Sequence, residues 1–109
     1  MTAAEVREIV RSQAVEGLTL VNDHRICLRD ALVQPVRLTV IDRVVKNGKV
    51  RDTEEVVWLV GRERVEDGYT IVMRETDCQF GLASTGFPHD KHQVMVGWYG
   101  SLITAFMGM

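Results

Sequence analysis

Apolar and polar residues alternate in the middle of the chain with the two-residue period of a half-buried strand. Val36, Leu38 and Val40 fall on one side of this run, and Arg37 falls on the other. Successive side chains of a strand point to opposite faces, so the run from 36 to 45 predicts a strand with one buried face. On the polar face, Arg37 is expected to stack on Trp58 of a neighbouring strand as a packing contact.

Two dipeptides, Asn47-Gly48 and Asp67-Gly68, interrupt the apolar runs. A type I′ turn needs positive φ at both of its central residues, and Asn, Asp and Gly adopt positive φ at low cost. Each dipeptide therefore predicts the tip of a two-residue hairpin. Together they predict three consecutive antiparallel strands, of which the third begins at Tyr69 and ends near residue 75.

A two-residue loop at the first dipeptide fixes the register of its hairpin. It sets Val45 opposite Val50 and Arg43 opposite Asp52, which gives an apolar pair and a charge pair. The same register carried along both strands sets a glutamate opposite a valine of the buried face. A β-bulge near Glu54-Glu55 would remove this mismatch and is therefore predicted.

Residues 2–16 have the spacing and the capping residues of an amphipathic helix. Thr2 stands at the N-cap, Glu5 completes a capping box three positions later, and Gly17 is suited to a left-handed stop. The apolar stripe is narrow, which favours a helix that lies on a sheet. The next stretch, residues 18–35, fits neither period, and Pro35 is expected to end it.

The segment from Val94 to Met109 contains no charged residue. Small residues and large apolar residues both recur in it at helical spacing. It therefore predicts a helix that begins between Pro88 and Lys91 and packs on the sheet. Such a tail is more apolar than one small domain can cover, which predicts a homodimer. The predicted interface anchors are Trp98, Tyr99, Leu102, Phe106 and Met107.

These elements together predict a single α+β domain over residues 1–109. It consists of an N-terminal helix, an antiparallel β-meander of three to five strands, and a C-terminal apolar helix packed on the sheet. Residues 79–83 are the candidate fourth strand.

Composition and charge narrow the class of protein. Of the 109 residues, 46% are hydrophobic and 26% are charged, as in an ordinary globular protein. The net charge is −2 with basic and acidic residues interleaved, so no nucleic-acid partner is predicted. The N-terminus has no targeting signal and the two cysteines are too few for a disulfide framework, which predicts a cytoplasmic protein. The apolar tail is shorter than the roughly 20 residues that cross a bilayer, so no membrane anchor is predicted.

Histidine and cysteine are the candidate metal ligands. Zinc takes four nitrogen or sulfur ligands, and a pair two residues apart can supply two of them from one turn. The candidates are His24, Cys27, Cys78, His89 and His92. The alternative is that the cysteines are small core residues and the histidines lie on surface loops. Neither pair is flanked by a tight glycine-bearing knuckle, so the second interpretation is favoured and no cofactor is predicted.

A nucleophilic dyad is another use of the same atoms. Cys78 with His89 has the residue types of a thiolate dyad, and Ser84 or Thr85 with His89 those of a hydroxyl dyad. Neither a nucleophile elbow nor a phosphate-binding loop surrounds them.

The polar loop between residues 77 and 92 is the predicted place of a binding site, because loops carry binding groups more often than strands do. Its candidate residues are Asp77, Ser84, Thr85, His89, Asp90 and His92. Asp90 also fits the N-cap of the predicted C-terminal helix.

The function that the sequence favours is a non-catalytic, cytoplasmic binding or adaptor module, homodimeric through its apolar C-terminal segment. It rests on the surplus of apolar surface and on the lack of a catalytic motif. The alternative is a small metal- or thiol-dependent enzyme that uses Cys78, His89 and His92. A protein partner other than a second copy is compatible with the first hypothesis.

Overall fold

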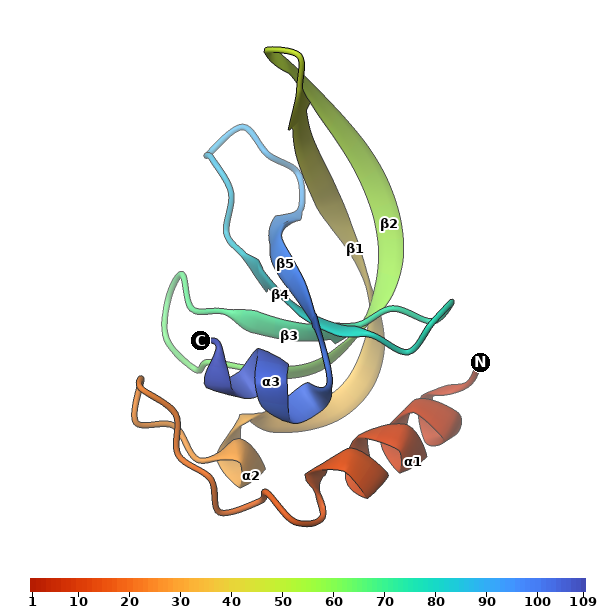
Figure 1. Cartoon of the computed structure of the whole chain (residues 1–109), viewed down its shortest axis with the longest axis vertical. Coiled ribbons are helices and arrows are strands. Elements are labelled where there is room, and N and C mark those ends of the chain that lie inside the picture. Colours follow the sequence, from red (N-terminus) through yellow and green to blue (C-terminus); the bar gives the residue numbers. More distant parts are fainter.

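The computed structural model describes residues 1–109 and folds them into a five-stranded barrel with helices at one end (Figure 1). The helices are α1 (Ala3–Ala14), α2 (Leu28–Ala31) and α3 (Leu102–Met107). The strands are β1 (Leu32–Lys46), β2 (Lys49–Arg62), β3 (Thr70–Met73), β4 (Phe80–Ser84) and β5 (Gln93–Gly100). The predicted α+β class and N-terminal helix are confirmed, and a C-terminal helix is present, although it is much shorter than predicted.

The barrel closes through a parallel contact that the predicted meander lacks. Each strand pairs antiparallel with the next one along the chain, as expected. β1 then pairs parallel with β5, with Val40 opposite Gln93 and Ile41 opposite Val94. A purely antiparallel meander is therefore wrong. Closure joins the first strand to the last and removes both sheet edges at this level of the barrel.

Helix α1 carries the predicted capping box. The Thr2 hydroxyl accepts the Glu5 N–H at 3.2 Å, and the Glu5 carboxylate accepts the Thr2 N–H at 3.0 Å. The predicted left-handed stop at Gly17 is wrong. Gly17 does not have a positive φ, and the helix ends at Val15, whose backbone is in the right-handed helical region. A Cβ at Gly17 would lie 2.6 Å from Cδ1 of Ile103. Glycine thus lets this segment pass close to α3.

The first predicted turn is confirmed and the second is longer than predicted. Asn47 and Gly48 both have positive φ, 52° and 73°. Asp67 also has positive φ, but Gly68 does not, and the β2–β3 connection spans residues 63–69. The Glu63 N–H donates to the Tyr69 carbonyl at 2.9 Å and closes this longer loop.

The β1–β2 register agrees with the prediction near the turn, with Val45 opposite Val50 and Arg43 opposite Asp52. The predicted bulge near Glu54-Glu55 is wrong, because the ladder runs unbroken through these residues. Glu55 lies opposite the buried Val40 and stays half-buried, so the mismatch is accommodated without a bulge. The β1–β2 register instead shifts where Pro35 lies inside β1, so Pro35 does not end an element.

The predicted long C-terminal helix is also wrong. Residues 93–100 form β5, Gly100 turns the chain at a φ of 84°, and Ser101 caps the short helix α3 by accepting the Thr104 N–H at 3.1 Å. Residues 93–100 form a strand because they pair with β4 and close the barrel against β1, and this tertiary pairing outweighs the helical spacing of the small residues.

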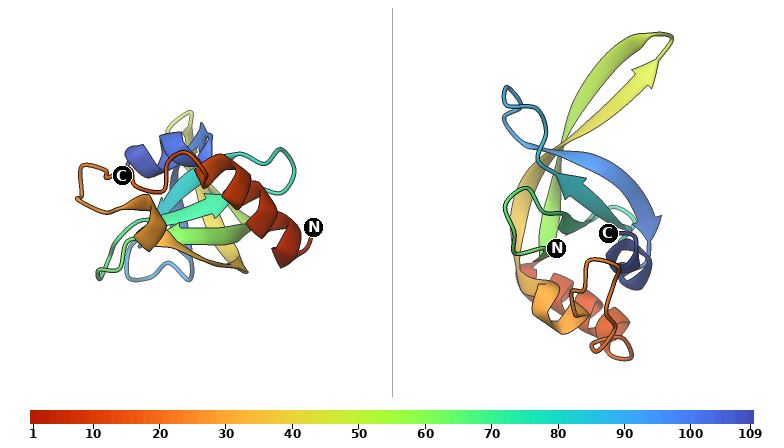
Figure 2. Two further views of the ribbon diagram at one scale, coloured as in Figure 1. Left: turned by 90° about the horizontal axis from the view of Figure 1, so that it is seen from below. Right: turned by 90° about the vertical axis from the view of Figure 1, so that its left-hand side faces the viewer.

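Two apolar clusters lie on opposite faces of the strands. The larger holds 15 buried residues and joins the barrel to all three helices. The smaller holds Val40, Val57, Val72 and Ala83. Neighbouring residues on β2, β3 and β4 belong to different clusters, as strand alternation requires. Figure 2 shows the three helices together at the base of the barrel.

The β1–β2 hairpin extends well beyond the closed barrel (Figure 1, Figure 2). β5 pairs with β1 only at Val40 and Ile41, and β3 pairs with β2 only from Trp58 onward. Residues 42–56 therefore form a two-stranded projection, which we call the arm. The arm lengthens the molecule, whose principal extents are 42 × 31 × 22 Å.

Candidate functional site

Arg43 clamps the β4–β5 loop, residues 85–92, to the base of the arm. Its Nε and Nη2 atoms each donate to the Asp52 carboxylate of β2 at 2.8 Å. Its Nη2 and Nη1 atoms donate to Asp90 of the loop at 2.8 and 3.3 Å. Asp90, whose side chain is only 5% exposed, also accepts the Phe87 N–H at 2.8 Å.

The charges of this clamp satisfy one another. Hydrogen bonds from Arg43 hold the pKa of Asp52 and the pKa of Asp90 below their ordinary values. The same bonds, first from Asp52 and then from Asp90, raise the pKa of Arg43. All three groups are therefore charged at neutral pH, and their role is to hold the loop. No helix begins at Asp90, so the alternative in which it caps the C-terminal helix is wrong.

Two of the other candidate residues, Ser84 and Thr85, lie at a shallow hollow, and the two histidines lie outside it. Ser84 and Thr85 line a cavity of about 280 Å³ together with Arg43 and Phe87. His89 lies outside it, with an 80% exposed side chain whose ring stacks on Phe87 at 5.8 Å between centroids. Farther along, Nε2 of His92 lies 3.6 Å from Oε1 of Glu54 on the arm.

Asp77 and Cys78 lie in the β3–β4 turn, at the opposite end of β4. Arg74 donates to both oxygens of Asp77, at 3.1 and 2.9 Å, and its guanidinium lies 4.3 Å from the centre of the Trp98 ring. These bonds lower the pKa of Asp77, which also accepts the Gln79 N–H. Asp77 thus stabilises a turn in which Cys78 has a φ of 55°.

The structure does not assemble the predicted metal or dyad constellations. No group of three or more His, Cys, Asp or Glu side chains is arranged to hold a metal ion. Cys78 and His89 lie in loops at opposite ends of β4, so a thiolate dyad lacks the contact between nucleophile and base. His24 and Cys27 lie together in a different connection.

The predicted interface anchors of the tail lie mostly inside the chain. Leu102 and Phe106 are completely buried in the larger cluster. Tyr99 is half-buried against the same cluster, and the Trp98 ring lies beneath Arg74. Only Met107, with 43% exposure, presents a large apolar surface to solvent.

His24 forms a contact with Glu63 that the sequence did not predict. Its Nδ1 atom lies 2.7 Å from Oε2 of Glu63, and Oε1 of Glu63 accepts the Tyr69 N–H at 3.0 Å. The His24 ring also stacks on Tyr69, with ring centres 5.9 Å apart. This contact joins the 22–30 connection, which runs from the loop after α1 into the first residues of α2, to the β2–β3 connection beside a cavity of about 310 Å³.

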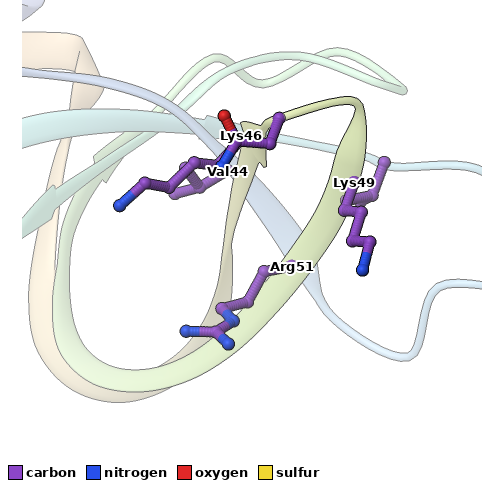
Figure 3. A pocket seen from close by; sticks show the side chains of 6 residues that line it. Val44, Lys46, Lys49 and Arg51 are labelled. Carbon is purple, nitrogen blue, oxygen red and sulfur yellow. The ribbon is translucent and has the colours of Figure 1, made fainter.

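The arm presents a basic tip and exposed valines. A hollow of about 620 Å³ near the tip is lined by Val44, Lys46, Asn47, Lys49, Val50 and Arg51 (Figure 3). Val45 and Val50 are 70% and 64% exposed. The outer edge of β2 has no neighbouring strand from Lys49 to Val57, because β3 pairs only from Trp58. An open strand edge of this length can pair with another chain.

Comparison of the chain with protein-family models, with curated proteins and with solved structures finds no match. None of the helices combines the length and apolar character that crossing a membrane would require. The function is therefore inferred from the geometry of the residues described above.

Proposed function

We propose that this chain is a non-catalytic, cytoplasmic binding module that forms a homodimer through the outer edge of β2. A homodimer agrees with the expectation from the sequence, but the proposed surface is the arm rather than the C-terminal tail. The burial of Leu102 and Phe106 within one chain argues against the tail. The open edge of the arm supplies backbone groups that a second copy can pair with.

The hairpin geometry decides which backbone groups face the open edge. A two-residue hairpin closes on a hydrogen-bonded pair, here Lys46 and Lys49, and such pairs recur at every second residue of an antiparallel ladder. Residues 49, 51, 53 and 55 therefore turn their backbone groups toward β1. The residues between them, 50, 52, 54 and 56, turn theirs outward.

This alternation restricts how two copies of β2 can pair. In an antiparallel pair, outward-facing residues must lie opposite outward-facing residues. A symmetric pair centred on Thr53 meets this condition, and so do pairs centred on Asp52 or Glu54. The last two place a carboxylate opposite its own copy on the symmetry axis, which is unfavourable. The axis at Thr53 is therefore the preferred one.

The side chains of β2 are complementary about Thr53, and this observation carries the proposal. The segment reads Lys-Val-Arg-Asp-Thr-Glu-Glu-Val from residue 49 to residue 56. Pairing about Thr53 sets Arg51 opposite Glu55 of the second copy, and symmetry repeats this ion pair. It also sets Val50 opposite Val56, which are 64% and 55% exposed in one chain. Both kinds of pair stabilise an antiparallel ladder.

One pair in this register brings like charges together, since Asp52 lies opposite Glu54 of the second copy. Both carboxylates have a basic neighbour within their own chain. Arg43 donates two hydrogen bonds to Asp52, and His92 lies 3.6 Å from Glu54. The Arg43 guanidinium reduces the repulsion that the pair would otherwise cause.

A charge exchange across the proposed interface tests the homodimer. Light scattering after size exclusion should give twice the chain mass of 12.3 kDa for the wild-type protein. Arg51→Glu alone and Glu55→Arg alone each place like charges opposite one another twice. Each should weaken the dimer about tenfold or more, since each affected pair contributes up to ~1 kcal/mol. The double variant restores both pairs and should restore the dimer.

Two further variants, Glu54→Pro and Val50→Asp, distinguish edge pairing from a general change of the surface, and Val65→Asp is their control. Glu54→Pro removes an outward N–H and should abolish the dimer while the β1–β2 ladder stays intact. Val50→Asp should weaken the dimer, whereas Val65→Asp should not, although Val65 is similarly exposed at 63%. A monomeric wild-type protein at high micromolar concentration would contradict the proposal, as would a double variant no more dimeric than its parents.

The enzyme hypothesis receives less support. It requires a base beside Cys78, but His89 lies beyond the far end of β4, and Nε of Arg74 donates to Asp77. A binding module needs no such constellation.

A further inference from the structure

The cavity beside His24 is lined by three arginines that have no partner within the chain. Arg25 comes from the 22–30 connection, Arg62 from the end of β2, and Arg64 from the β2–β3 connection. We call these residues, together with His24, the arginine pocket. Its volume of about 310 Å³ is in the range of small-ligand sites.

The state of these guanidinium groups contrasts with that of the arginines that hold loops. Arg43 and Arg74 donate to carboxylates through several bonds each. The side chains of the three pocket arginines form no hydrogen bond and no ion pair. Each guanidinium carries five N–H donors in a rigid planar arrangement, which suits the oxygens of a bound anion.

The His24 ring is held in a fixed orientation beside the pocket arginines. Glu63, whose side chain is 11% exposed, accepts from Nδ1 of His24 and from the Tyr69 N–H. Stacking on Tyr69 fixes the plane of the ring. This arrangement leaves Nε2 of His24 without a partner in the chain.

The connection that carries His24 and Arg25 is rigidly anchored. Oδ1 of the buried Asn22 accepts the N–H groups of His24 and Ile26, at 3.0 and 3.2 Å. Nδ2 of Asn22 donates to the Phe106 carbonyl at 3.1 Å and so ties the connection to α3. Arg25 adopts a φ of 61° within it, an uncommon conformation for arginine. The backbone of this connection is thus held in place, whereas the side chains of Arg25, Arg62 and Arg64 are exposed.

The charges of the arginine pocket favour an anion. Two carboxylates also line the cavity, Asp30 and Glu63. Glu63 is occupied by His24 and Tyr69, so Asp30 is the single unpaired carboxylate against three guanidinium groups. The chain as a whole has a net charge of −2, which makes this positive cluster a local feature.

We propose that the arginine pocket binds a phosphate group, as inorganic phosphate or as a small phosphate monoester. Three guanidinium groups can surround the oxygens of a tetrahedral oxyanion, whereas a flat carboxylate offers only two oxygens. This binding is independent of the homodimer, because the pocket and the edge of β2 share no residue. Failure of either proposal leaves the other standing.

A titration with inorganic phosphate tests the pocket. At constant ionic strength, balanced with chloride, phosphate should shift the His24 ring resonances saturably, and calorimetry should give the same dissociation constant. Arg62→Gln and Arg64→Gln should each weaken binding about tenfold or more, because each removes a charge-assisted bond. Arg29→Gln is the matched control, since Arg29 is an exposed arginine of α2 outside the cavity, and it should bind phosphate as the wild type does.

Two comparison ligands identify the source of the phosphate group. Tighter binding of glycerol 3-phosphate than of inorganic phosphate would show that the pocket takes a monoester, and equal binding that it takes the phosphate alone. Acetate at the same ionic strength should bind at least tenfold more weakly than phosphate. The absence of saturation below about 10 mM phosphate would overturn the proposal. Equal losses in Arg29→Gln and Arg64→Gln, or acetate binding as tight as phosphate binding, would also overturn it.

Discussion

The two ends of this molecule keep their structure by different means. At the base, three helices and the barrel share a cluster of 15 buried residues. The arm has a regular hydrogen-bonded ladder and ion pairs at its root, but every residue from Val44 to Glu54 is exposed. Backbone pairing therefore continues where burial has ended.

This difference explains why the arm is the proposed contact surface. A two-stranded hairpin is only marginally stable when nothing packs on it, so an arm of this length with exposed valines gains stability from a partner. The base already has a core of 15 buried residues within one chain, although Val15, Leu18 and Met107 remain exposed there. We therefore expect substitutions at the two ends to differ in how much stability they remove and in how much of the molecule they destabilise. Three predictions test this difference.

The largest effect is expected at the base. Phe106→Ala removes a completely buried ring from α3 and should lower the free energy of unfolding by about 3–5 kcal/mol. Met107→Ala, one residue later at a 43% exposed position, should change it by less than about 1 kcal/mol. Urea unfolding of both variants measures the difference. Equal losses would mean that α3 is not packed as described.

A smaller effect is expected at the root of the arm, and it depends on pH. The lowered pKa values of Asp52 and Asp90 mean that the unfolded chain takes up protons before the folded chain does as pH falls. Their contribution is present above the ordinary aspartate pKa of about 3.9 and is lost as pH falls through the folded values. Arg43→Gln removes the cause of both shifts. It should be less stable than wild type at pH 7, and the gap should narrow below about pH 4.

Urea unfolding at several pH values between 7 and 3 measures this gap. Arg7→Gln is a suitable control, because Arg7 contacts Gln34 and no carboxylate. A gap between wild type and Arg43→Gln that stays constant down to pH 3 would show that the clamp is not what lowers the two pKa values.

The smallest effect compares two glycines, one at each end. Gly48 in the arm and Gly100 between β5 and α3 have φ values of 73° and 84°, and a Cβ would meet no atom within 4 Å at either position. Alanine thus adds only backbone strain, about 1 kcal/mol. Gly100→Ala should lower global stability by that amount. Gly48→Ala should mainly speed amide exchange at the tip, where local fraying relieves the strain.

Hydrogen exchange and urea unfolding together distinguish these outcomes. A loss of global stability in Gly48→Ala as large as that in Gly100→Ala would show that the arm unfolds together with the barrel. The arm and the base would then not differ in local stability.

The local features of the fold could be predicted from the sequence because they depend on a few neighbouring residues. The capping box at Thr2, the turn at Asn47-Gly48 and the pairing of Arg43 with Asp52 all depend on short-range geometry. The stacking of Arg37 on Trp58, at 4.4 Å, is confirmed for the same reason. The sequence predicts a helix over β5 because its apolar and small residues recur at helical spacing, and pairing with β4 and with the distant β1 makes it a strand.

The candidate sites were harder to predict, because their partners lie far apart in the chain. Asp90 meets Arg43 and His24 meets Glu63 across loops whose paths no short pattern encodes. The arginines at 62 and 64 flank Glu63 in the sequence, but only the fold brings Arg25 beside them. The charge order of β2 was visible in the sequence, yet its meaning depends on knowing that this edge lacks a neighbouring strand.

The parallel contact between β1 and β5 has a consequence for how the chain folds. Val40 and Gln93 are far apart in sequence, so the barrel can close only after most of the chain has been synthesised and brought together. Proteins dominated by such distant pairings fold in milliseconds to seconds rather than microseconds. Until β5 arrives, the β1 and β4 edges are both open, and a chaperone that covers strand edges would find its substrate in this interval.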